Sequence, residues 1–132
     1  MIIPLFKDEA LLEDIRQAGR ETDHFHLWWL GQSGFLLCWQ ERFLLFDPYL
    51  SDSLTRKYAG TEKPHVRMTE RAVDPGLLDF IDVVTSSHNH TDHLDAETLG
   101  PLFEANPDLA MVVSRANRTF VAQRLGMPED RF

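Results

Sequence analysis

The sequence has few of the residues that define several large classes of protein. Its 132 residues include one cysteine, so no disulfide can form within the chain. The 13 lysines and arginines are outnumbered by 21 aspartates and glutamates, and the net charge of −8 makes a nucleic-acid partner an unfavourable interpretation. No apolar run approaches a membrane span, and the N-terminus lacks the basic and apolar pattern of a secretion signal. These absences predict a cytoplasmic protein without a membrane partner.

The motifs of several well-known kinds of catalysis are also absent. The sequence contains no Gly-x-Ser-x-Gly turn, no Cys-x-x-Cys pair and no Walker phosphate loop. The single thiol, Cys38, lies between Leu37 and Trp39, which predicts a small buried apolar side chain rather than a nucleophile. Any chemistry must therefore depend on other side chains.

Apolar residues make up 43% of the chain, enough for the core of one domain. The first half predicts a helix over 9–18, closed by Gly19, and then strands over 25–29, 35–40 and 43–46. The short turns between these strands predict an antiparallel meander. The third strand, Phe43-Leu44-Leu45-Phe46, is apolar at every position, so we expect it to be covered on both faces.

The second half alternates strands with helices. Asp74 and Pro75 begin a short helix over 73–80, and strands are predicted over 82–86 and 109–114. Helices are predicted from Asp95 or Thr91 through Phe103 or Glu104, and over 116–125. This alternation indicates parallel pairing with right-handed crossovers, so the fold class is α/β with a mixed sheet. Residues 51–71 have no regular pattern and predict a long loop.

The most informative stretch is 88–93, His88-Asn89-His90-Thr91-Asp92-His93, which holds three of the six histidines of the chain. In an extended backbone, alternate side chains share a side, so His88, His90 and Asp92 would converge while His93 leaves in another direction. One loop could then offer His88 and His90 to one cation and Asp92 and His93 to a second. The alternative is a polar loop whose histidines only form hydrogen bonds.

Two other residues are candidates for supporting roles. Asp47 ends the third predicted strand before Pro48, where it could accept hydrogen bonds from the metal loop or simply form an Asp-Pro turn. His65 lies in the irregular segment and could face the pocket and contact substrate, although a solvated loop histidine is the favoured interpretation.

The motif 88–93 resembles the His-x-His-x-Asp-His signature of the metallo-β-lactamase superfamily. The segments 28–35 and 45–52 are similar to the branch that contains ascorbate-6-phosphate lactonase and related hydrolases. The resemblance implies an αββα sandwich with a site for two divalent metal ions, and it favours Asp47 as the residue that braces the histidine loop. Zinc and manganese fit the donors, and iron is a third option.

The sequence departs from the superfamily pattern after this loop. Members of the family complete the site with a later histidine, a bridging aspartate and a final histidine, but no histidine follows His93. The chain stops at Phe132, where the resemblance predicts further strands. We therefore expect residues 1–132 to be the N-terminal part of a single domain, the first half of the sandwich. This half is expected to need its C-terminal complement, in the same or a separate chain, or to self-associate.

The resulting hypothesis is a metal-dependent hydrolase of a small anionic substrate of lactone or phosphorylated-lactone type. Two cations about 3.5–4 Å apart can generate a hydroxide from a shared water, and Asp92 is the candidate that positions or deprotonates it. A metallophosphodiesterase or nuclease of the same superfamily is one alternative. A non-catalytic fragment or binding module with an incomplete metal site is the other.

Overall fold

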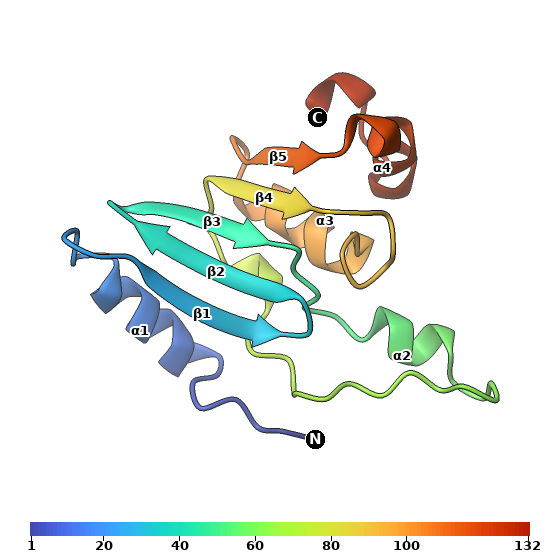
Figure 1. The fold of residues 1–132 in the computed structure, drawn as a ribbon, viewed down its shortest axis with the longest axis horizontal. Helices are drawn as coiled ribbons and strands as arrows, with labels where there is room; N and C mark the ends of the chain where they lie inside the picture. The colour runs from blue at the N-terminus through green and yellow to red at the C-terminus, as the bar shows by residue number, and fades with distance from the viewer.

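The computed structural model describes residues 1–132 and contains one five-stranded mixed sheet in the order β1-β2-β3-β4-β5 (Figure 1). The antiparallel meander consists of β1 (His26–Gly31), β2 (Gly34–Trp39) and β3 (Arg42–Phe46). Parallel pairing then adds β4 (Val83–Ser86) and β5 (Ala110–Val113) to β3. The predicted α/β class and the change from antiparallel to parallel pairing are confirmed.

The helices begin and end near the predicted positions. Helix α1 has the predicted bounds, and Gly126 ends α4 in the left-handed conformation (φ 66°). Asp74 caps a short 3₁₀ helix by accepting a hydrogen bond from the backbone N–H of Gly76 (2.9 Å). The helices are α1 (Glu9–Ala18), α2 (Ser53–Lys57), α3 (Ala96–Ala105) and α4 (Arg118–Leu125), with 3₁₀ turns η1 (Pro75–Leu77), η2 (Arg115–Asn117) and η3 (Glu129–Arg131).

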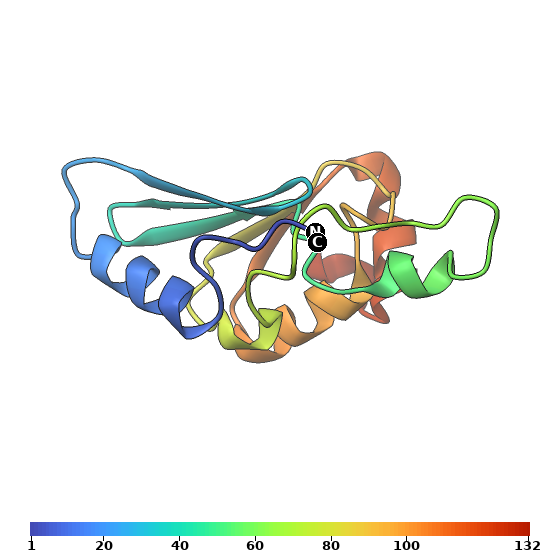
Figure 2. The same cartoon turned by 90° about the horizontal axis from the view of Figure 1, so that it is seen from below.

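The core lies on one face of the sheet. Figure 2 shows α1, η1 and α3 on the same side of the strands. Leu36, Leu45 and Val84 are fully buried and belong to the hydrophobic core. Cys38 is also buried there, and burial raises the pKa of its thiol, so the predicted apolar role is confirmed. A fully buried leucine contributes roughly 1.5–3 kcal/mol relative to an exposed one, so this layer supplies most of the stability.

The opposite face of the sheet is uncovered, and we call it the open face. On β3, Leu45 is 0% exposed, whereas Phe46 on the other side is 36% exposed. The prediction that β3 is covered on both faces is therefore wrong for this chain. Apolar residues at every position of β3 predict packing on both of its faces, but helices cover only one face in this chain. Large apolar side chains on the open face are Leu27, Trp29, Phe35, Trp39 and Phe46.

The irregular segment 51–71 holds more structure than its composition predicted. It contains α2 and the buried Arg67, whose Nε donates to the carbonyl of Thr69 (3.1 Å). The Nη1 atom of Arg67 donates to the carbonyls of Tyr49 and Ser51. A single arginine therefore ties this segment to the chain that leaves β3, because buried carbonyls need donors.

Candidate metal centre

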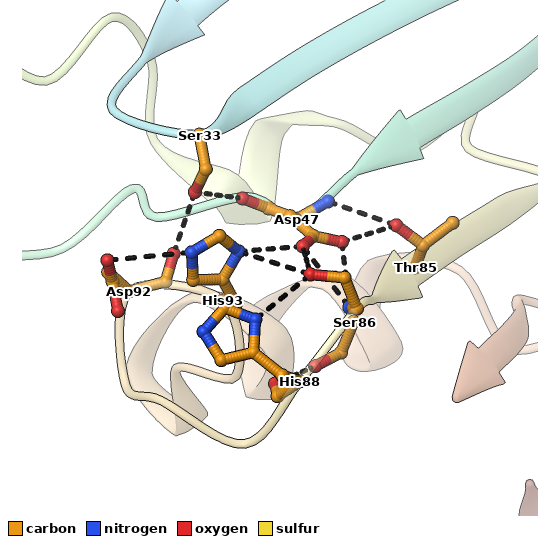
Figure 3. A network of polar contacts seen from close by, with 8 residues as sticks. Ser33, Asp47, Thr85, Ser86, His88, Asp92 and His93 are labelled. Carbon is orange, nitrogen blue, oxygen red and sulfur yellow. Dashed lines mark hydrogen bonds and ion pairs between the residues drawn. The ribbon is translucent and has the colours of Figure 1, made fainter. Parts of the chain in front are cut away.

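The C-terminal ends of the parallel strands β3 and β4 lie side by side, at the end of the sheet where the histidine loop begins. Asp47 follows β3 directly, and Ser87 and His88 follow β4. The turn between β1 and β2 reaches the same edge, where the hydroxyl of Ser33 donates to the carbonyls of Asp47 (3.2 Å) and Asp92 (3.1 Å) (Figure 3). Three separate segments of the chain thus meet at one point.

The carboxylate of Asp47 is the centre of a hydrogen-bond network. Its Oδ1 atom accepts from the hydroxyl of Thr85 (2.6 Å) and from the backbone N–H of Ser87 (3.1 Å). Its Oδ2 atom accepts from the Ser87 hydroxyl and lies 2.7 Å from Nδ1 of His93. Because an ionised carboxylate only accepts, Nδ1 of His93 is the donor in this contact. Both oxygens of Asp47 are therefore occupied by protein donors.

Asp47 is 8% exposed and adopts a positive φ of 41°. Burial raises the pKa of its carboxyl, but the hydrogen bonds from Ser87, Thr85 and His93 outweigh burial and lower the pKa below the ordinary value. The left-handed backbone is sterically costly for a residue other than glycine. A strained backbone that carries a strongly hydrogen-bonded carboxylate is a common feature of functional sites.

The two histidines that flank the loop lie against each other. The ring centroids of His88 and His93 are 3.9 Å apart, and one donor atom each from Asp47, His88 and His93 falls within 4.8 Å of the others. The Nδ1 atom of His88 lies 3.1 Å from the hydroxyl of Ser87. In both rings Nδ1 is held by the protein, which leaves Nε2 for a metal ion.

His90 and Asp92 lie beside this cluster but are not among the three residues whose donor atoms converge. The ring of His90 lies 4.7 Å from that of His88, and Oδ2 of Asp92 lies 3.6 Å from Nε2 of His93. The structure brings His88 closer to His93 than to His90, although the sequence analysis assigned His88 and His93 to different cations, so that assignment stays a prediction. The loop is bent rather than extended. The backbone N–H of His93 donates to the carbonyl of His90 (3.0 Å), and this turn brings His93 back toward His88.

Sequence reasoning missed three residues of the network. Ser33, Thr85 and Ser87 supply hydroxyl groups that hold Asp47 and the loop, and none belongs to the histidine motif. The position of Ser33 within Gly31-Gln32-Ser33-Gly34, in the segment that resembles the superfamily, was the available signal. Thr85 and Ser87 carried no separate signal, because serine and threonine are common at strand ends.

His65 lies apart from this network. It lines a cavity of about 460 Å³ together with Asp52, Thr55 and Arg67, and no residue of 88–93 lines that cavity. Its Nδ1 atom is 3.4 Å from the hydroxyl of Thr55, and its ring packs edge-on against Tyr49. The role of His65 in substrate binding stays a prediction.

Fold and site together define an α/β protein with a candidate divalent-metal centre at the ends of parallel strands. A family model described as a beta-lactamase superfamily domain matches residues 26–125. The chain belongs to this superfamily, which confirms the resemblance carried by the motif 88–93, and its mixed sheet is the half-fold of a metallo-β-lactamase-type protein.

The chain is similar to parts of several known proteins, three of which follow. A probable L-ascorbate-6-phosphate lactonase UlaG from Escherichia coli O127:H6 is 26% identical over 71% of this chain and 31% of its own length. A protein of the same name from Salmonella heidelberg is 24% identical over 92% of this chain and 39% of its own. The Saccharomyces cerevisiae mitochondrial N-acyl-phosphatidylethanolamine-hydrolyzing phospholipase D is 37% identical over 54% of this chain and 14% of its own. The chain therefore spans well under half the length of these relatives.

None of its helices has the length and apolar composition that crossing a membrane requires.

Proposed function

We propose that residues 1–132 form the N-terminal part of a metal-dependent hydrolase that acts on a small anionic substrate of lactone or phosphorylated-lactone type. The observation that carries this proposal is the fixed orientation of the His93 ring. Asp47 fixes its Nδ1 atom at 2.7 Å, and its Nε2 atom faces Oδ2 of Asp92 at 3.6 Å. The two relatives named as probable lactonases support the substrate class.

The proposal includes two divalent ions. In the proposal His88 and His90 hold one ion, and Asp92 and His93 contribute to the other. Asp47 orients His93 rather than binding metal, because hydrogen bonds already occupy both of its oxygens. Imidazole with carboxylate suits zinc or manganese, with iron as a third option.

A bound pair of divalent ions supplies a water molecule of lowered pKa and stabilises negative charge on the reacting oxygens. In the proposal the side chain of Asp92 orients this water and accepts its proton. Its position supports this role, because Ser33 fixes the backbone carbonyl of Asp92 (3.1 Å) while the carboxylate stays half-exposed beside His93. Thr85 and Ser87 keep Asp47 ionised and oriented, so that His93 presents one nitrogen only.

The remainder of the whole protein is proposed to complete the site and to cover the open face of the sheet. Two facts support this: the chain spans 31–39% of the two lactonase relatives, and Trp29 and Trp39 are half-exposed. An apolar sheet face of this kind is costly in water unless another layer packs on it. The protein is placed in the cytoplasm in this proposal, because its single buried cysteine needs no oxidising compartment.

The test is hydrolysis of lactones and phosphorylated lactones by the full-length protein that contains this segment. We expect a chelator to abolish turnover and zinc or manganese to restore it. Asp92→Asn should lower kcat by at least about 100-fold, in the range of a lost general base. Asp79→Asn is the matched control, because Asp79 is exposed and lies outside the site. Metal-independent hydrolysis, or full activity of Asp92→Asn, contradicts the proposal.

A second candidate function is phosphodiester hydrolysis by the same site, supported by the yeast phospholipase D relative. Bound divalent ions could hold a phosphate despite the negative net charge of the chain. The assay above separates the two candidates if a bis-aryl phosphodiester is tested beside the lactones under identical metal conditions. Faster cleavage of the phosphodiester would favour the second candidate, and no turnover of either substrate would favour a binding module.

A further inference from the structure

A second cluster of potential metal ligands lies at the end of the sheet opposite to the histidine loop. Glu21, His24 and His26 occupy the connection between α1 and the start of β1, seen at the far end of the sheet in Figure 1. One donor atom from each of the three residues lies within 4.8 Å of the other two. The Asp47 network contains none of these residues.

The distances around Glu21 fit a single small ion. Its Oε2 atom lies 3.1 Å from Nε2 of His24 and 3.9 Å from Nε2 of His26. Donor atoms of a tetrahedral zinc site are separated by about 3.3 Å, given bond lengths near 2.0–2.2 Å. The second distance is too long for a hydrogen bond, but it is suitable for two ligands of one ion after a small closure.

The buried nitrogen of His26 is the strongest observation. Its Nε2 atom is shielded from solvent and has no hydrogen-bond partner, although its ring is packed beside the rings of His24 (4.6 Å) and Trp28 (5.9 Å). A buried polar atom without a partner is costly, so native proteins rarely leave one unsatisfied. A metal bond from the lone pair of this nitrogen would remove that cost.

The ring of His24 lies between two carboxylates. Its Nδ1 atom is 2.8 Å from a carboxylate oxygen of Asp23, and its Nε2 atom is 3.1 Å from Oε2 of Glu21. An ion bound at Nε2 would need the tautomer whose proton is on Nδ1, the nitrogen beside Asp23. Metal-bound histidines in proteins commonly donate their other ring N–H to a carboxylate in this way.

We propose that Glu21, His24 and His26 bind one zinc-class divalent ion, with Asp23 as the residue that orients His24. Two imidazoles and one carboxylate leave a fourth position for water, and the exposed setting of Glu21 and His24 admits the ion from solvent. The ion would link the segment after α1 to the first residue of β1 and thereby stabilise that end of the sheet. This site is independent of the proposed hydrolase function.

The test uses the complete chain with His88 and His93 both changed to alanine, so that the first site is disabled. Zinc is titrated while the side-chain nitrogens of the remaining histidines are followed by NMR. We expect one zinc per chain, large shifts at Nε2 of His24 and His26, and little change at His65. Zinc should also raise the melting temperature of this protein.

Substitutions in the same background separate a built site from a surface ion pair. Glu21→Gln and His24→Ala should each weaken zinc binding by at least about 100-fold, and Asp23→Asn by about tenfold. Glu62→Gln is the control for an exposed glutamate outside the cluster. Glu21 and His24 are exposed, so their variants are expected to fold even if His26→Ala does not. Zinc binding that is unchanged in Glu21→Gln and His24→Ala, or binding only at millimolar zinc in the unsubstituted cluster, overturns the proposal.

Discussion

Nδ1 of His93 lies 2.7 Å from Oδ2 of Asp47, although 46 positions separate the two residues in the sequence. This contact joins the end of β3 to the end of the histidine loop. It fixes which nitrogen of His93 carries the proton and therefore which one can bind a metal ion. The proposed metal chemistry of the chain depends on this pair.

The first prediction concerns the contribution of Asp47 to metal affinity. Asp47→Asn should raise the Kd for zinc at the histidine loop by about 10–100-fold, because an amide cannot accept from Ser87, Thr85 and His93 together. Isothermal titration in a His24→Ala background would measure this site alone. Asp79→Asn is the control, and equal affinity of the Asp47→Asn and control proteins would mean that Asp47 is only a turn former.

The second prediction concerns the dependence of stability on pH. The pKa of Asp47 is lowered in the folded chain by its hydrogen bonds, from an unfolded value of about 3.9. Ionised Asp47 therefore stabilises the fold fully above that unfolded value, and this contribution is lost as the pH falls through the folded-state pKa. The free energy of unfolding in urea should be lower for Asp47→Asn by roughly 1–3 kcal/mol at pH 7. The difference from the unsubstituted chain should shrink below about pH 4, and a constant difference from pH 7 to pH 3 would contradict this explanation.

The third prediction concerns the open face. The isolated chain should self-associate as its concentration rises, because Leu27 and Trp39 are 54% and 52% exposed on an uncovered sheet. Replacing both with lysine should give a monomer by size-exclusion chromatography with light scattering. Leu77→Lys is a matched control, since Leu77 is 52% exposed but lies in η1, away from the open face. A monodisperse monomer of the unsubstituted chain at high concentration would refute the prediction.

The fourth prediction concerns Gly31, which ends β1 beside the turn that carries Ser33. Gly31 has a φ of +94°, and a Cβ atom there would lie 2.4 Å from Oγ1 of Thr69. Gly31→Ala should therefore destabilise the fold by about 1–3 kcal/mol. Gly100→Ala is the informative comparison, because Gly100 lies within α3 with open space around its Cβ position. That variant should change the free energy of unfolding, measured in urea, less than Gly31→Ala does, because the helix propensity gained is offset by the contact of the new Cβ with the following Pro101.

Local patterns determined much of the fold. The amphipathic segment 9–18, the turn residues around Gly31 and the Asp74-Pro75 pair each encode their own conformation, so their positions were predictable without tertiary information. The motif 88–93 likewise identified the candidate metal residues, because the residue types and the spacing occur together in few other contexts.

Other features depend on residues that are distant in the sequence. The bend that returns His93 to His88 depends on hydrogen bonds within the loop and on Asp47, so an extended backbone was the wrong expectation. The lack of a hydrogen-bond partner for Nε2 of His26 could not be predicted either, because alternation in the sequence identified a strand and gave no information about hydrogen-bond partners.

By itself, the sequence determined the order of strands and helices and the residues able to bind metal, because periodicity and side-chain chemistry are local properties. Only the tertiary structure decided that one sheet face is open, that Asp47 holds His93, and that Glu21 lies between two imidazoles. The physical reason is that burial and hydrogen bonding depend on which distant segments pack together, and the chain achieves this only when β3, β4 and the crossovers between them assemble.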